Sequence, residues 1–144
     1  MRFMMFVKAD KTTEAGVLPT QKDLEVMGKY NEELVKAGVL LDAAGLQPSS
    51  KGAKVTFQGG KPQVTDGPFV ETKELIAGYW MIQVKSKEEA ISWAKRVPFD
   101  RLPGSGRAPE IEVRQMFEVT DFPDVPPEVA KMEESFKAGR GGKA

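Results

Sequence analysis

Two segments that lie far apart in the chain, 2–8 and 78–84, are apolar almost without alternation. Their Phe, Met, Val, Tyr, Trp and Ile side chains are types that favour β-strands. A strand with apolar side chains on both faces needs cover on both sides of its sheet. The two segments therefore predict the central strands of a sheet that is buried on both sides.

Helix and strand patterns alternate around these two segments. The expected elements are a strand at 2–8, a helix at 21–37, a strand at 39–41, hairpin arms at 53–58 and 62–65, a strand at 78–84, a helix at 87–97 and a strand at 111–119. This order is the split βαβ pattern of a ferredoxin-like α+β domain with an inserted β-hairpin. Because both crossovers should be right-handed, we expect both helices on one face of the sheet.

The sheet face turned away from these helices needs its own cover. A second copy of the sheet would supply that cover and give a symmetric homodimer. The alternative cover is the C-terminal segment, where Val129, Met132 and Phe136 follow the Pro-rich stretch 121–127 at helical spacing. We therefore divide the chain into a domain over 1–120 and a Pro-rich tail over 121–144. The tail is expected to carry a short amphipathic helix and to be disordered over 139–144.

Charge balance and two missing residue types narrow the possible functions. Lys plus Arg equals Asp plus Glu at 21 each, so nucleic acid is not an expected partner. The chain has no Cys and no His, which removes thiolate chemistry, the commonest general base and the commonest metal ligand. We expect no metal and no cofactor. Without a secretory leader pattern or a membrane-length apolar run, the predicted location is cytoplasmic, away from any membrane.

The most distinctive stretch combines turn-forming and charged residues. It runs Asp66-Gly67-Pro68-Phe69 and continues with Glu71-Thr72-Lys73. Functionally, Asp66 is the candidate acid/base group, provided that burial or a second acid raises its pKa. Glu71, Thr72 and Lys73 are candidate ligand contacts beside it. The structural alternative is a rigid strand-to-strand corner with a solvated acidic rim.

Four further polar residues are candidate ligand contacts. Asn31 falls on the expected core-facing stripe of the first helix, with Leu24, Met27, Leu34 and Val35, and Tyr30 lies beside it. Gln47 belongs to a polar loop, and Arg114 projects from the last strand as a possible anion fork. Three of them have a structural alternative: a satisfied helix–loop hydrogen bond for Asn31, an ordinary turn for Gln47, and a surface ion pair with Glu112 or Glu118 for Arg114.

Taken together, the stretches 66–69 and 71–74 with Gly78-Tyr79 resemble the DGPF group of the YciI-related (YCII) family. The likeness extends from Met1 to Phe122 and includes Gly38-Val39-Leu40, Gly45-Leu46-Gln47-Pro48 and Glu112-Val113-Arg114. The resemblance implies a dimeric α/β-barrel type of assembly, made from two ferredoxin-like folds. It also implies a regulatory association with extracytoplasmic-function sigma factors. Two departures concern chemistry: the chain lacks the His of the family's His–Asp pair, and Gln47 stands where relatives often carry His.

Two functions of different classes follow. The first is a cofactor-free enzyme for a small organic molecule, with Asp66 as acid/base, Tyr30, Asn31 and Gln47 as polar contacts and Arg114 as anion anchor. The second is a non-catalytic ligand-binding or regulatory dimer module. The absence of His and Cys favours the second, and the family's suspected activity favours the first.

Overall fold

A computed structural model of the chain describes residues 1–102 and 107–141. The strands are β1 (Arg2–Lys8), β2 (Leu40–Gly45), β3 (Ala53–Gln58), β4 (Lys61–Asp66), β5 (Ile76–Gln83) and β6 (Ile111–Gln115). The helices are α1 (Lys11–Glu14), α2 (Gln21–Lys36), α3 (Lys87–Lys95) and α4 (Pro127–Gly141). Short 3₁₀ turns are η1 (Ser49–Lys51), η2 (Phe99–Arg101) and η3 (Val119–Asp121).

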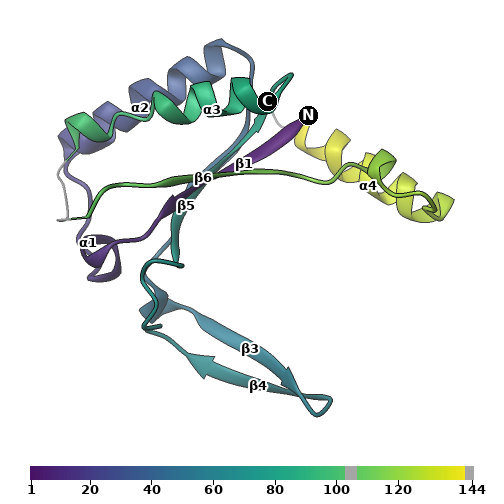
Figure 1. Ribbon diagram of the computed structural model, residues 1–144, viewed down its shortest axis with the longest axis horizontal. Coiled ribbons are helices and arrows are strands. Elements are labelled where there is room, and N and C mark those ends of the chain that lie inside the picture. The colour runs from purple at the N-terminus through teal and green to yellow at the C-terminus, as the bar shows by residue number, and fades with distance from the viewer. Residues whose placement is uncertain (103–106, 142–144) are drawn as a thin grey trace.

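The main sheet has four strands in the order β2-β5-β1-β6, and its neighbouring strands are antiparallel. The two strands with apolar side chains on both faces, β1 and β5, are central, as the sequence predicts. Figure 1 shows α2 and α3 together on one side of this sheet. The chain is therefore an α+β protein, and its strand order is consistent with the predicted ferredoxin-like fold.

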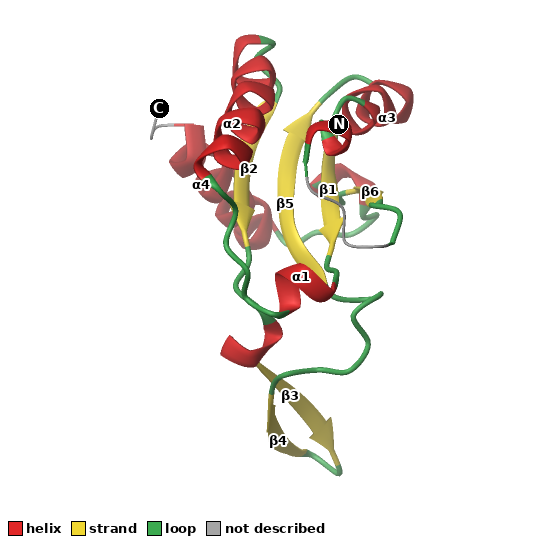
Figure 2. Cartoon of the chain, turned by 90° about the vertical axis from the view of Figure 1, so that its left-hand side faces the viewer, coloured by secondary structure: helices red, strands yellow, loops and turns green. Residues whose placement is uncertain are grey.

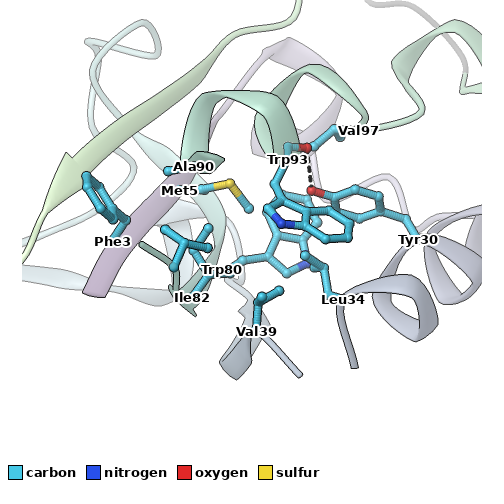
Figure 3. Close-up of a cluster of buried hydrophobic side chains, with 11 residues drawn as sticks. Phe3, Met5, Tyr30, Leu34, Val39, Trp80, Ile82, Ala90, Trp93 and Val97 are labelled. Carbon is cyan, nitrogen blue, oxygen red and sulfur yellow. Dashed lines mark hydrogen bonds between the residues drawn. The ribbon is translucent and has the colours of Figure 1, made fainter. Parts of the chain in front are cut away.

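The core lies between the sheet and helices α2 and α3 (Figure 3). Phe3 and Met5 from β1 and Ile82 from β5 are almost completely buried against Leu34 of α2. Thr20 begins α2 by accepting a hydrogen bond from the Asp23 backbone N–H, and Ser86 begins α3 in the same way through Glu89. The buried side of α2 is narrower than the sequence predicts. Leu24 and Val35 are exposed, so placing them in the core was wrong.

The opposite face of the sheet carries a second apolar set. Since side chains alternate along a strand, Met4 and Phe6 of β1 and Tyr79 and Met81 of β5 point away from the core residues. Met81 is buried, and Met4, Phe6 and Tyr79 are half-buried. In Figure 1 the β3–β4 hairpin projects away from the main sheet. We call Met4, Phe6, Tyr79 and Met81 the open face.

The hairpin forms a separate two-stranded sheet that projects from the domain (Figure 2). Val55 pairs with Val64 across it, and every residue of β3 and β4 is exposed. The sequence analysis did not foresee that the hairpin stands outside the main sheet.

Three further differences concern segment ends. The last strand stops at Gln115 rather than at 119, and Phe117 is exposed, so its alternation with Val113 does not continue the pairing. The expected loop after β1 contains α1, which Asp10 caps by accepting from the Thr13 backbone N–H. The C-terminal helix α4 continues through 139–141, where we expected disorder, and 142–144 lie outside the described residues.

A tight corner joins the hairpin to the domain at Gly67. The Gly67 N–H donates to the Gly52 carbonyl across the hairpin root at 3.0 Å. A Cβ at Gly67 would lie 1.8 Å from the backbone oxygen of Ser49, a distance that no side chain tolerates. The corner therefore requires glycine for space.

We expect Gly67→Ala to lower the melting temperature, because the backbone at Ser49 or Gly67 must move to admit the methyl group. Overpacking of this kind costs about 1–3 kcal/mol. Gly45→Ala is the matched control, since a Cβ there meets nothing within 4 Å. Thermal unfolding followed by circular dichroism measures both variants. Equal melting temperatures would contradict the close approach.

Glu118 ties the tail to the domain. The Arg2 Nε donates to its Oε1 at 2.7 Å, and the Lys137 Nζ of α4 lies 2.7 Å from its Oε2. The hydrogen bond from Arg2, followed by that from Lys137, lowers the pKa of Glu118 from 4.5 to about 2 although partial burial opposes the shift. A carboxylate with a lowered pKa stabilises the folded state above its unfolded pKa and loses that effect on acidification.

Stability of the native chain should therefore fall as the pH drops from 4.5 towards about 2, in part through Glu118. Glu118→Gln should flatten this part of the stability–pH curve. Glu128→Gln, which removes an exposed carboxylate from the same tail, should leave the slope unchanged. Urea unfolding at a series of pH values measures the slopes, and parallel curves for Glu118→Gln and the native chain would refute the assignment.

Candidate functional site

Two of the predicted ligand contacts, Tyr30 and Asn31, lie between α2 and the sheet. The Tyr30 hydroxyl donates to the Trp93 carbonyl oxygen at 2.7 Å (Figure 3), and burial raises its pKa. The Asn31 Oδ1 accepts from the Trp80 Nε1–H at 2.7 Å. The Tyr30 and Trp80 rings pack in a T-shaped arrangement with their centroids 5.3 Å apart. Both polar groups thus join α2 to the core. Asn31 has a satisfied internal hydrogen bond, although its partner lies on β5 and not in a loop. A role of either residue in ligand binding stays a prediction.

The other predicted contacts lie near the hairpin. Asp66, Glu71 and Lys73 are exposed, and Thr72 is half-buried. Gln47 is exposed in the loop after β2. In Figures 1 and 2 the hairpin and α2 lie at opposite ends of the molecule, so the structure does not bring these residues together with Tyr30 and Asn31.

The corner after Asp66 is held by a residue pair that sequence reasoning missed. The Ser49 hydroxyl donates to Glu14 of α1 and accepts from the Phe69 backbone N–H at 3.0 Å. The Ser49 backbone N–H donates to the Glu14 carboxylate at 3.0 Å. On the other side, the Lys54 ammonium stands 4.3 Å from the centre of the Phe69 ring. These contacts fix the direction of the hairpin, which agrees with the structural alternative for the motif.

A second pair that the sequence analysis missed lies at one edge of the open face. The Tyr79 hydroxyl of β5 donates to the Asp42 Oδ2 of β2 at 3.0 Å. Asp42 pairs with Met81 in the sheet register, so the carboxylate and the thioether side chain are neighbours on the same face. The predicted alternation of 78–84 would have put Tyr79 beside Met81, but no local pattern links Asp42 to Tyr79.

Arg114 lies at the other edge of the open face. In the sheet register Met4 pairs with Arg114, and Phe6 pairs with Glu112. The Glu112 carboxylate lies 3.0 Å from the Lys8 Nζ and accepts from the Arg114 Nη1 at 3.2 Å. These two hydrogen bonds, that from Lys8 being the stronger, lower the pKa of Glu112. The ion pair is the structural alternative for Arg114. Its side chain is nevertheless 70% exposed and can reach a second anion.

The open face thus combines an apolar floor with polar groups at both edges. Met4, Phe6 and Met81 make the floor, between Tyr79–Asp42 on one side and Arg114–Glu112–Lys8 on the other. Over 1–102 and 107–141, no three His, Cys, Asp or Glu side chains gather where they would hold a metal ion. None of the helices described is long and apolar enough to cross a membrane.

Comparison with known proteins gives a family but no activity. Over 69 residues the chain is 39% identical to an uncharacterized protein, R00369, of Rhizobium meliloti (strain 1021). That match covers 48% of this chain and 56% of the relative, so little more than half of the relative's length is matched. The family model of the YCII-related domain matches residues 1–116, which include the whole main sheet and the hairpin. The chain therefore belongs to the YCII-related family.

Proposed function

We propose that the chain is a homodimeric small-molecule-binding protein, whose ligand lies against the open face. In this assembly the open faces of two copies meet, as in the dimeric α/β-barrel type. The observation that carries the proposal is the apolar open face, which lies on the side of the sheet away from α2 and α3. Contiguous apolar surface rimmed by polar groups is typical of interaction and ligand sites.

The residues at the open face suggest the chemistry of the ligand. Met4, Phe6 and Met81 suit an apolar body, since Met side chains adapt to irregular shapes. Arg114 suits an anionic group, because its planar fork can bind a carboxylate through two parallel hydrogen bonds. The Tyr79 hydroxyl, held by Asp42, suits a polar group at the other end of the ligand. We therefore propose a small organic anion as ligand, bound without turnover in a regulatory or carrier role.

Native mass spectrometry of the purified chain should show a dimer that carries a reproducible extra mass. Arg114→Gln should keep the dimer and lose most of the extra mass, because the anion then lacks its charge partner. Arg101→Gln is the matched control, since it removes an exposed arginine of η2, away from the open face. A monomer would contradict the assembly. Retention of the extra mass by Arg114→Gln would contradict the anion anchor.

The alternative function is a cofactor-free enzyme with Asp66 as its acid/base group. Its support is the position of Asp66 at the hairpin root, directly before the rigid Gly67–Phe69 corner, where the backbone around a reacting group would be well fixed. A dimer could bring this carboxylate against a partner's surface and supply the burial that a general base needs.

If Asp66 is the base, Asp66→Asn should abolish turnover of the molecule found by mass spectrometry, with a loss of about 100-fold or more. The variant should still fold and bind, since the Asp66 side chain is exposed. Glu74→Gln, a change of an exposed carboxylate on the same connection, is the control. Turnover is measured by chromatography of the mixture over time. Undiminished turnover by Asp66→Asn would exclude Asp66, and absence of turnover by the native chain would leave the binding function alone.

A further inference from the structure

The hairpin presents an apolar face that no other described part of the chain covers. Val55, Phe57 and Val64 lie on this face and are 53%, 76% and 68% exposed. In the pairing register they are opposite one another or opposite Pro62, while Lys54, Thr56 and Gln63 occupy the other face. A two-stranded hairpin is at best marginally stable in water unless one face packs against something. This arrangement favours a role for the β3–β4 hairpin, which we call the arm, in docking to another surface.

The root of the arm is fixed, and its tip stands far from its own domain. Gly67 bonds to Gly52, and Ser49 bonds to Glu14 and Phe69, on both sides of the root. The arm extends away from α2 and α3 in both ribbon views (Figures 1 and 2). These bonds hold the root of the arm in place relative to the domain.

A groove that matches this face in chemistry lies between η3 and α4. Phe117 and Phe122 pack together with ring centroids 5.0 Å apart, and Val129 of α4 is 44% exposed beside them. The groove has an open volume of about 440 Å³. Glu118, Asp124 and Glu133 also line it. The groove is therefore lined by both apolar and acidic side chains.

The hairpin segment and the groove segment have net charges of opposite sign. The arm and its root, 51–66, contain Lys51, Lys54 and Lys61 against the single acid Asp66. The groove segment, 117–137, contains two lysines, Lys131 and Lys137, and six acids, which are Glu118, Asp121, Asp124, Glu128, Glu133 and Glu134. Lys137 and Arg2 already pair with Glu118, so Asp124 and Glu133 are the groove's remaining acids. Opposite net charges favour the encounter of two surfaces and select the correct pairing.

We propose that the hairpin of one copy docks in the groove between η3 and α4 of a second copy. Val55, Phe57 and Val64 then cover Phe117, Phe122 and Val129 of the other copy, and the opposite net charges of the two segments favour their encounter. In a two-fold dimer both arms dock at once, since such an interface uses the same surfaces twice. The inference rests on the homodimer of the proposed function but not on its ligand.

Disulfide trapping tests the contact, because the chain has no cysteine of its own. A Val64→Cys protein is mixed with a Val129→Cys protein and oxidised, and the mixed disulfide is followed over time. Docking holds the two thiols at high effective concentration, so we expect the mixed disulfide to form at least about tenfold faster than with a Gln63→Cys arm. Gln63 is the adjacent residue whose side chain lies on the opposite face of the hairpin.

Sedimentation equilibrium supplies the second measurement. Phe57→Asp should weaken dimerisation by about 30-fold or more, as the loss of a central aromatic contact does. Thr56→Asp adds the same charge to the other face of β3 and should have a much smaller effect.

Either of two results overturns the inference: equal trapping by Val64→Cys and Gln63→Cys, or equal weakening by Phe57→Asp and Thr56→Asp. A native dimer that fails both tests refutes the arm contact and leaves the open-face dimer standing. Trapping in a protein that carries no extra mass refutes the ligand and leaves the arm contact standing.

Discussion

The pairing of β1 with β5 is the constraint on which the rest of the structure depends. Both strands carry apolar side chains on both faces, and their register sets Met5 beside Trp80 on one face and Met4 beside Met81 on the other. Helices α2 and α3 cover only the face that carries Met5 and Trp80. Burying a large apolar side chain contributes about 1.5–3 kcal/mol, so a second cover would add substantially to stability. The open face and the proposal of a dimer both follow from this asymmetry.

The sequence predicts best what local patterns determine. The continuous apolar runs identify β1 and β5, Thr20 and Ser86 begin their helices, and Gly59-Gly60 turns the hairpin. The sequence predicts less well where an alternating pattern continues past the end of the neighbouring strand. Phe117 continues the alternation of β6, but the pairing of β6 with β1 ends where Gln115 meets Phe3. Helical spacing likewise does not say how wide the buried stripe is.

The candidate site is harder to predict because its contacts join residues that are distant in sequence. Glu14 meets Ser49 and Asp42 meets Tyr79, and only the folded chain brings either pair together. The Asp66 motif shows the same limit in another form. Gly67 is needed because the Ser49 backbone oxygen leaves no space for a Cβ. The requirement is therefore steric and does not indicate catalysis. A distinctive motif therefore identifies the family more securely than it identifies a catalytic group.

The open face and the hairpin arm lead to the same kind of partner for separate reasons. The open face needs a flat apolar surface, which the same face of a second copy provides. The arm needs an acidic apolar groove, which the segment 117–137 of a second copy provides. In the proposed dimer each contact would use different residues of the same partner.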